Sequence, residues 1–443
     1  MTPRKHSGRA VIIGASMGGL FAARVLSERF DSVLILERDD LDNTVGGRRG
    51  VPQGRHAHAL LQSGLLQIEE WFPGITQELI DGGGVVLDPG KDIHWFQGGG
   101  EKVKYATGGE WPVVSRPRLE ESVRNRVEKL DNVELRTNTH AEGLVTTPDK
   151  TRITGVKLED GSVLDAALVL DCTGRSGRTL PWIEELGYVL PAVDEVTINM
   201  RYTTRTYKKN PAWEPDWKLA IVIGRPPAAR LGVCFPMEGD RWMVTLCGFH
   251  GEFAPDDDDG FLAYARTLES AVVADAIEHN EPLTDYASHR LPSNQRRRVE
   301  KMTNVPAGWA LLGDAIASFN PVYGQGMSSA ALQAAAAGAA IDAYPGSVDA
   351  ELTRRVHKAA AKAVNNAWSL STGGDFAHPK TTGKKAPGTD LINRYMARLV
   401  VVDQTDVEVA KAFDAVGNLM APPPSVLKPR IAWRVLRGPR RTG

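Results

Sequence analysis

Apolar residues near the start of the chain alternate between strand-like runs and helical spacing. Residues 10–13 form a continuous apolar run, residues 20–29 carry apolar side chains at helical spacing, and residues 33–36 form a second apolar run. Short apolar runs separated by a helical segment are typical of parallel strands that are buried on both faces. The pattern therefore predicts a β-α-β unit in this part of the chain.

Further predicted elements continue this alternation of strands and helices, and a series of strands without helices between them then follows. A helical pattern at 119–130 is followed by strand-like runs around 133–137, 153–158 and 167–171, which we expect to extend the same domain. The next four runs are strand-like and are joined by short loops that contain Gly or Pro, which favours antiparallel pairing. These runs are residues 197–207, 217–223, 230–235 and 241–248.

The last part of the chain returns to alternating strand and helix patterns and then becomes mostly helical. A strand-like run at 309–314 precedes an alanine-rich helical pattern at 328–343, on which another element must pack closely. Beyond residue 345 the pattern is mostly helical, interrupted at 372–388 and by the prolines at 422–424. An insertion within the first domain is the simplest chain order that explains this return.

The predicted fold class is α/β, with a Rossmann-like domain, an inserted antiparallel-sheet substrate domain and a C-terminal helical region. We expect six segments along the chain. They are 1–70, the first part of the Rossmann-like domain; 71–105, an insertion on the substrate side; 106–190, the second part of the Rossmann-like domain; 191–295, the sheet substrate domain; 296–345, the third part of the Rossmann-like domain; and 346–443, a helical cap.

Composition limits the class of protein. The chain has 443 residues, of which 42% are hydrophobic and 24% charged, an ordinary balance for a globular protein of enzyme size. Lys+Arg of 53 against Asp+Glu of 54 give a formal net charge of -1, which argues against binding to nucleic acid. The three cysteines lack metal-type spacing, so we expect no metal and a reducing, cytoplasmic compartment. We expect neither a transmembrane nor a signal segment.

The turn between the first strand and the first helix is rich in glycine, with the sequence GASMGG at 14–19. Such a turn lets a pyrophosphate approach backbone N–H groups at the positive end of a helix. Ser16 takes the middle glycine position and fits if its hydroxyl turns toward a phosphate oxygen. Glu37 closes the second strand, where a carboxylate accepts hydrogen bonds from a ribose. A dinucleotide such as FAD or NAD is therefore expected, although a lone turn of this kind is also an ordinary tight connection.

Two later segments complete a set that is complementary to one dinucleotide. The first is DCTGRSG at 171–177, which follows a predicted strand. The second is the Gly-Asp pair at 313–314, which runs on to PVYGQG at 321–326. The last motif contains two glycines, Gly324 and Gly326.

Together and in this order, these motifs resemble those of class A flavoprotein monooxygenases, the group built on a fold like that of para-hydroxybenzoate hydroxylase. The resemblance extends from about Arg9 to about Ala343. It implies FAD as the cofactor, with the pyrophosphate at the first turn, the adenosine ribose at Glu37 and the ribityl chain at Asp314. The implied cofactor-binding residues are Gly14, Ser16, Gly19, Glu37, Arg38, Arg116, Asp171, Gly174, Gly313 and Asp314.

The same resemblance places the loop at 321–326 beside the flavin ring. Only one dinucleotide turn is recognisable, so NADPH or NADH is expected to bind transiently as the electron donor, with O2 as the other co-substrate. The middle motif departs from the usual Asp-Gly pair because Cys172 and Thr173 come before Gly174, which leaves the site of the nicotinamide donor open. The implied catalytic residues are Pro321, Tyr323, Gly324, Gln325 and Gly326.

Two stretches, GVPQGRHAH at 50–58 and NPVYGQGM at 320–327, are similar to stretches in actinobacterial tailoring monooxygenases, including the olefin epoxidases of polyether biosynthesis. This similarity implies hydroxylation or epoxidation of a hydrophobic small molecule, such as a polyketide or isoprenoid intermediate. Apolar residues of the inserted sheet are expected either to form one wall of the substrate cavity or to be plain sheet core. They are Trp217, Val222, Val233, Phe235, Trp242 and Val244.

Other functions on the same scaffold stay open. A flavin halogenase would share the FAD motifs, but the Trp-x-Trp-x-Ile-Pro segment typical of that group is absent from the sequence. A prenyl-type flavin reductase and a catalytically idle flavoprotein also share the scaffold. The intact loop at 321–326 argues against an idle protein.

Three other features have simpler interpretations. His56 and His58, two residues apart, point to opposite sides of an extended segment, so a shared metal is not expected. The acidic run at 256–259 lacks the alternating ligands of a calcium loop and is expected to start a helix. The basic stretches at 296–298 and 428–441 are expected to be solvated or to dock on the protein.

Overall fold

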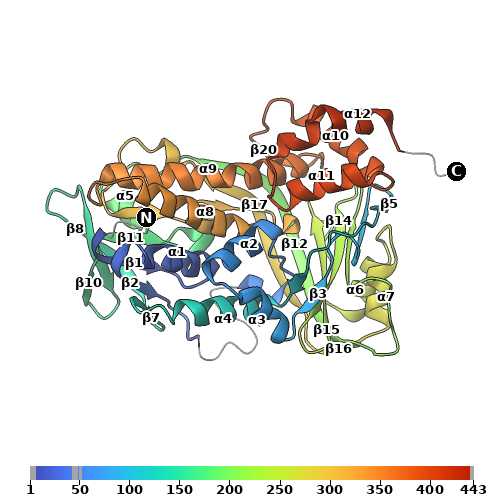
Figure 1. Cartoon of the computed structure of the whole chain (residues 1–443), viewed down its shortest axis with the longest axis horizontal. Coiled ribbons are helices and arrows are strands. Elements are labelled where there is room, and N and C mark those ends of the chain that lie inside the picture. Colours follow the sequence, from blue (N-terminus) through green and yellow to red (C-terminus); the bar gives the residue numbers. More distant parts are fainter. Residues whose placement is uncertain (1–5, 42–47, 49–51, 440–443) are drawn as a thin grey trace.

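The computed structural model describes residues 6–41, 48 and 52–439, and two main β-sheets make up its body (Figure 1). A parallel sheet lies at one end of the molecule, and a larger, mostly antiparallel sheet lies at the other. Two long helices, α8 (Gly326–Asp342) and α9 (Ala350–Asp375), run along one side of the parallel sheet. The two sheets thus divide the molecule into a parallel half and a mostly antiparallel half.

The first sheet has five strands in the order β18-β11-β1-β2-β7, and every neighbouring pair is parallel. Its apolar runs are buried, and α1 (Met17–Ser27) crosses from β1 to β2. The predicted Rossmann-like core is therefore confirmed. The strands are β1 (His6–Ile13), β2 (Phe30–Leu36), β7 (Val133–Arg136), β11 (Leu168–Asp171) and β18 (Trp309–Leu311).

The second sheet is antiparallel over the four strands that the sequence predicts, which lie in the order β12-β15-β14-β13. It continues past β12 through β17 and β19, and past β13 through β4, which pairs with β13 in parallel. Of the remaining strands, β5 ends the sheet beyond β4, whereas β16 and β20 both pair with parts of β12. The bounds are β4 (Ile93–Gln97), β5 (Gly100–Glu101), β12 (Val193–Lys208), β13 (Leu219–Ile223), β14 (Arg230–Met237), β15 (Arg241–Phe249), β16 (Glu281–Pro282), β17 (Ala287–Arg297), β19 (Ala317–Ser318) and β20 (Thr382–Gly383).

Two small sheets complete the strand inventory. One is a three-stranded antiparallel sheet of β8 (Ala141–Thr146), β9 (Ile153–Leu158) and β10 (Val163–Asp165), and the other pairs β3 (Val85–Leu87) with β6 (Trp111–Val113). The predicted strand at 153–158 therefore forms β9 of a separate sheet rather than a strand of the parallel one. The division of the chain into six segments stays a prediction.

The helices of the Rossmann-like half pack closely on one another. The alanine-rich α8 contacts both α1 and α9. A Cβ on Gly338 of α8 would lie 2.5 Å from the Val25 side chain of α1, so the two helices approach too closely for a larger residue there. The other helices of the first part of the chain are α2 (Gln62–Trp71), α3 (Ile75–Asp81), α4 (Arg116–Val127) and α5 (Leu180–Glu185).

Helices at the other end cover the second sheet. In α6 (Asp258–Ala265) the Asp257 carboxylate accepts the Gly260 N–H at 2.8 Å, so the acidic run does start a helix. Together α6 and α7 (Val272–Glu278) bury one face of the sheet. Three C-terminal helices share a small core with Leu399, Val409 and Val435 (Figure 1). They are α10 (Thr389–Val402), α11 (Val407–Gly417) and α12 (Pro429–Arg437).

Short 3-10 turns connect several of these elements. They are η1 (Pro52–Arg55), η2 (Gly174–Ser176), η3 (Val299–Lys301), η4 (Gly313–Ala315), η5 (Pro321–Tyr323) and η6 (Pro423–Leu427). The helix α9 continues to Asp375, so the predicted break at 372 begins later than expected. The first two residues of the GVPQGRHAH stretch, 50 and 51, lie outside the described residues. Within the described part of the chain, no helix has the length and apolar character needed to cross a lipid bilayer.

Candidate functional site

The glycine turn between β1 and α1 is closed by backbone contacts. Gly14 has a φ of +102°, and a Cβ there would lie 2.8 Å from the carbonyl oxygen of Cys172. A Cβ on Gly19 would lie only 1.8 Å from the carbonyl oxygen of Gly14. Both positions therefore require glycine, and the turn brings the first N–H groups of α1 to the carboxyl edge of the sheet.

Glu37 at the end of β2 is tied to this turn. Its buried carboxylate accepts the Ala15 N–H at 2.8 Å and the Asp39 N–H at 2.9 Å, and Arg48 pairs with it at 2.5 Å. The side chain of Arg38 instead extends into solvent and is 50% exposed. The two neighbouring predicted site residues therefore differ in their environment. Glu37 is buried and bonded to the glycine turn, whereas Arg38 is exposed beside it.

Ser16, the residue in place of the middle glycine, joins an ionic cluster. Its hydroxyl donates to Glu120 at 2.9 Å and accepts from Arg116 at 2.9 Å. It thus turns toward Glu120 in this structure, and a contact of this hydroxyl with a phosphate oxygen stays a prediction. Burial opposes ionisation of Glu120, but the guanidinium groups of Arg116 and Arg48 outweigh it and lower the pKa of this carboxyl.

Arg116 lies at the first position of α4, which begins three residues before the predicted helical pattern at 119–130. The N-cap is Ser115, whose hydroxyl accepts the Arg118 N–H at 3.4 Å, so Arg116 belongs to the first turn. This places a cation beside the start of α1. Sequence reasoning missed Glu120, although its position four residues after Arg116 on a helix was a signal for a salt bridge.

The middle motif is organised around a buried acid. The Asp171 carboxylate accepts hydrogen bonds from the N–H and the hydroxyl of both Thr173 and Thr179, at distances of 2.6 to 2.8 Å. Gly174 follows with a φ of +76° at the start of η2. Asp171 therefore holds the loop in place, and the backbone of Cys172 and Thr173 is the part of this loop that lies against Gly14 of the glycine turn.

The third motif meets the first one directly. Gly313 has a φ of +67°, and a Cβ there would lie 3.8 Å from the Cα of Gly18 in the first turn of α1. The next residue, Asp314, neither caps a helix nor accepts a hydrogen bond from any residue that the structure describes. Burial raises the pKa of Asp314, while Arg116 and Arg175 act in the opposite direction. Asp314 is thus a partly buried acid whose oxygens are available to a ligand.

The loop before α8 presents a further unsatisfied polar group. Asn320 caps η5 by accepting the Val322 N–H at 3.1 Å, and Gly324 ends it with a φ of +65°. Gln325 is 2% exposed, and its Oε1 finds no hydrogen-bond partner among the residues described. Because buried amides are normally hydrogen-bonded, this side chain is suited to a ligand in the site.

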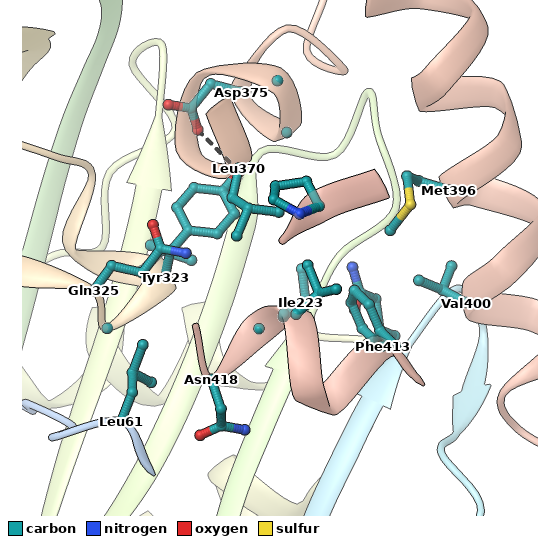
Figure 2. A pocket seen from close by; sticks show the side chains of 18 of the residues that line it. Leu61, Ile223, Tyr323, Gln325, Leu370, Asp375, Met396, Val400, Phe413 and Asn418 are labelled. Atoms are coloured by element: carbon teal, nitrogen blue, oxygen red, sulfur yellow. Dashed lines mark hydrogen bonds between the residues drawn. The ribbon is translucent and has the colours of Figure 1, made fainter. Parts of the chain in front are cut away.

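A cavity of 1940 Å³ extends from this loop between the second sheet and the C-terminal helices. Figure 2 shows part of its wall, where side chains from separate parts of the chain converge. The labelled residues are Leu61, Ile223, Tyr323, Gln325, Leu370, Asp375, Met396, Val400, Phe413 and Asn418. The larger, apolar share of these residues gives the cavity a mainly hydrophobic wall.

The two faces of the second sheet have different roles. Val233 and Phe235 of the predicted apolar set line the cavity, together with Ile221 and Ile223. The rest of the set packs under α6 and α7 instead, because side chains alternate between the faces of a strand. Of the two interpretations that the sequence left open, plain sheet core therefore holds for four residues of the set. They are Trp217, Val222, Trp242 and Val244.

His56 and His58 line the same cavity in neutral form. His56 Nδ1 lies 2.7 Å from the Thr204 hydroxyl, and His58 Nδ1 donates to the His56 carbonyl at 2.8 Å. Burial is the main cause that lowers the pKa of His56 to about 3 and that of His58 to about 4. No three His, Cys, Asp or Glu side chains of the described ranges gather as metal ligands would.

Asp375 is a site residue that sequence reasoning missed. It ends α9, faces the loop at 321–326 and accepts a hydrogen bond from the Tyr323 hydroxyl at 3.2 Å. The residues are 52 positions apart, and Asp375 lies beyond the motifs of the Rossmann-like half. Its position after two glycines was the only local signal in the sequence.

Comparison with known proteins identifies the family that the chain matches. The model of the FAD binding domain family matches residues 8–367. Protein Rv3254 of Mycobacterium tuberculosis is 32% identical over 408 residues, which cover 87% of this chain and 83% of that protein.

Solved structures show the same fold. A flavoprotein/dehydrogenase from Cytophaga hutchinsonii has 13% identity and a TM-score of 0.68, covering 97% of this chain and 99% of that one. PqsL, a probable FAD-dependent monooxygenase from Pseudomonas aeruginosa, has 17% identity and a TM-score of 0.61, covering 92% and 100%. The resemblance to the fold of FAD-dependent monooxygenases is thus confirmed, and this chain belongs to the FAD-binding domain family.

Proposed function

We propose that this protein is an FAD-dependent monooxygenase that uses NADPH or NADH and O2 to hydroxylate or epoxidise a hydrophobic small molecule. One observation carries the proposal. The loop with Tyr323 and Gln325, which directly precedes α8 of the FAD-binding half, forms part of the wall of a mainly apolar cavity of 1940 Å³. A cofactor held by the glycine turn and by Asp314 would therefore face a space suited to an apolar substrate.

The residues present fit FAD. Gly14 and Gly19 leave the backbone free to approach a pyrophosphate, and Arg116 supplies positive charge beside the start of α1. The unsatisfied carboxylate of Asp314 is suited to the ribityl hydroxyls, and Gly324 allows the backbone to approach the ring. When bound, FAD supplies the transfer of electrons from the nicotinamide to oxygen.

The side chains of the chain itself position the substrate and exclude water. Ile221, Val233 and Phe235 on the second sheet form an apolar wall, and the uncharged His56 and His58 add no net charge to it. In such a dry site the polar groups of the loop at 321–326 act more strongly than they would in water. Epoxidation needs no general base, whereas hydroxylation of a phenol is helped by one.

The size of the cavity supports a large substrate. Ordinary ligand pockets have volumes of about 300–1,000 Å³, and the cavity here measures 1940 Å³. This leaves room for a flavin ring together with an extended apolar molecule. A polyketide or isoprenoid intermediate is the substrate class that we propose.

The test is a search for turnover with defined products. We expect the purified protein to release FAD on denaturation and, in air, to oxidise NADPH or NADH faster when an accepted alkene or phenol is added. Each reaction is repeated with bromide and chloride, and without oxygen. A halogenated product, or an alkene saturated without oxygen uptake, would assign the FAD-binding fold to a halogenase or a reductase instead.

A further inference from the structure

Asp375 is a buried acid without a counter-charge. It is 2% exposed, and no cation of the described residues pairs with it. Burying a carboxylate without a counter-charge costs free energy. Buried acids of this kind are often found at functional sites, so a functional role is a reasonable explanation for Asp375. Asp375 also lines the cavity and faces the loop of candidate catalytic residues.

Three donors surround the Asp375 carboxyl. Asn294 Nδ2 donates to Oδ2 at 2.6 Å, while Asn320 Nδ2 and the Tyr323 hydroxyl donate to Oδ1 at 2.8 and 3.2 Å. Figure 2 shows the Tyr323 ring extending toward this carboxyl from the loop below it. Burial raises the pKa of Asp375 and the three hydrogen bonds oppose it, which leaves the pKa at about 6.

Other titratable groups on the neighbouring elements are engaged elsewhere. Arg296 on β17, two positions after Asn294, donates to the carbonyl oxygen of Ala361 at 3.1 Å. The ring of His378, which follows α9, stacks on an aromatic ring of the second sheet. Tyr323 is therefore the titratable side chain that the described structure places in direct contact with Asp375.

The Tyr323 hydroxyl is held at a defined place. A Cβ on Gly374 would lie 2.2 Å from this oxygen, so the hydroxyl rests directly over the last turn of α9 where a side chain is missing. Both Tyr323 and Asp375 line the cavity. A proton transferred between the Asp375 carboxyl and the Tyr323 hydroxyl is therefore transferred at the wall of the cavity in which we propose that the reaction takes place.

We propose that Asp375 and Tyr323 form a proton relay at the wall of the cavity. Protonated Asp375 donates from Oδ1 to the Tyr323 oxygen, and the Tyr323 hydroxyl donates its own proton to an oxygen atom in the cavity. As the Tyr323 O–H bond breaks, an O–H bond forms on the acceptor and the Asp375 proton replaces the one lost. The three donors then hold the carboxylate until solvent returns a proton.

This relay rests on the proposed function, because reduction of the second oxygen atom of O2 to water consumes a proton. Asp375 acts through Tyr323 and is thus a positioning and proton-holding residue. Its role is separable from a purely structural one, since a structural role would leave the pH profile of the reaction unchanged.

The first test follows the titration of Asp375 in the full-length protein with FAD and without turnover, by infrared spectroscopy of its carboxyl. We expect a band that titrates near pH 6 and is lost in Asp375→Asn. Asp403→Asn is the matched control, since Asp403 is also buried with a pKa raised to about 7 but does not line the cavity.

Two further variants probe the contact itself. Tyr323→Phe removes one donor to the carboxylate, and Gly374→Ala pushes the hydroxyl away while keeping both residues. Either change should raise the pKa of Asp375 by about one unit, the size expected for one hydrogen bond to a charged group. An unchanged pKa of Asp375 in both variants overturns the relay.

The second test is the pH profile of product formation. With an accepted substrate, Asp375→Asn should lower kcat by at least about tenfold, leave KM unchanged and remove the limb near pH 6. An unchanged profile in Asp375→Asn, with normal oxygen insertion, overturns the relay alone. The absence of oxygen insertion by the wild-type protein overturns the proposed function, and with it the relay.

Discussion

Gly14 and Gly19 meet so closely that a Cβ on Gly19 would lie 1.8 Å from the carbonyl oxygen of Gly14. This distance is far inside van der Waals contact, and the oxygen belongs to backbone that is fixed between a buried strand and a helix. The start of α1 is therefore held against the end of β1 without room for any side chain. That contact directs the first N–H groups of the helix toward the carboxyl edge of the sheet, where we expect the pyrophosphate.

We predict that Gly19→Ala destabilises the protein by more than about 2 kcal/mol, because the turn must open to admit the methyl group. Gly18→Ala is the matched control, since its Cβ would meet no atom closer than 3.9 Å, the Cα of Gly313. Denaturant unfolding of both variants checks this. Equal losses of unfolding free energy would contradict the packing of the turn.

Asp314→Ala should weaken FAD binding by about 10–150-fold, because it removes a charge-assisted hydrogen bond worth about 1.5–3 kcal/mol. Folding should suffer little, since the Asp314 carboxylate accepts no hydrogen bond within the described structure and burial already raises its pKa. Titration of the FAD-free protein with FAD, combined with thermal melting of the same samples, separates the two effects. Unchanged FAD affinity with lowered stability would remove Asp314 from the cofactor site.

Local motifs were predictable from the sequence because each is contained in one turn. The glycines at 14 and 19, Glu37 and the pair at 313–314 depend on residues next to them or on a strand end nearby. The contacts of Glu120 with Ser16 and of Asp375 with Tyr323 were not predictable, since the partners lie 104 and 52 residues apart. Only the folded chain brings such pairs together.

The orientation of the second sheet could not be predicted from the sequence either. Its strands carry apolar side chains on both faces, so alternation predicts two apolar faces without saying which of them meets a cavity. In the structure α6 and α7 cover the face with Trp217 and Val222, and the cavity lies on the face with Ile221.

Ile221 and Val222 are neighbours on β13 that test this assignment. Ile221→Ala should raise KM for an apolar substrate and cost little stability, because the side chain lines the cavity. Val222→Ala should leave KM unchanged and lower the free energy of unfolding by about 1–3 kcal/mol, because it empties a buried core position. Steady-state kinetics and denaturant unfolding of both variants give the comparison, and the reverse pattern would invert the faces of the sheet.

The contribution of Asp403 to stability should fall as pH rises from about 4 to about 7. Burial is the main cause that raises the pKa of Asp403 from its ordinary value of 3.8 to about 7, so the folded state keeps this proton where the unfolded state has lost it. The free energy of unfolding then decreases by up to about 1.4 kcal/mol per pH unit for this group. Asp403→Asn should remove this contribution, so that the free energy of unfolding of the wild type, relative to that of the variant, decreases as pH rises. Equal slopes in the variant and the wild type would show that Asp403 is ionised in the folded protein.

The most direct test of the central claim is the origin of the oxygen atom in the product. With FAD, NADPH and an accepted hydrophobic substrate, the account predicts that one atom from labelled molecular oxygen enters each product molecule and that labelled water contributes little. Mass spectrometry of the product in paired reactions, one with labelled O2 and one with labelled water, measures both quantities. Product oxygen drawn from water, or product formed without oxygen uptake, would contradict the assignment as a monooxygenase.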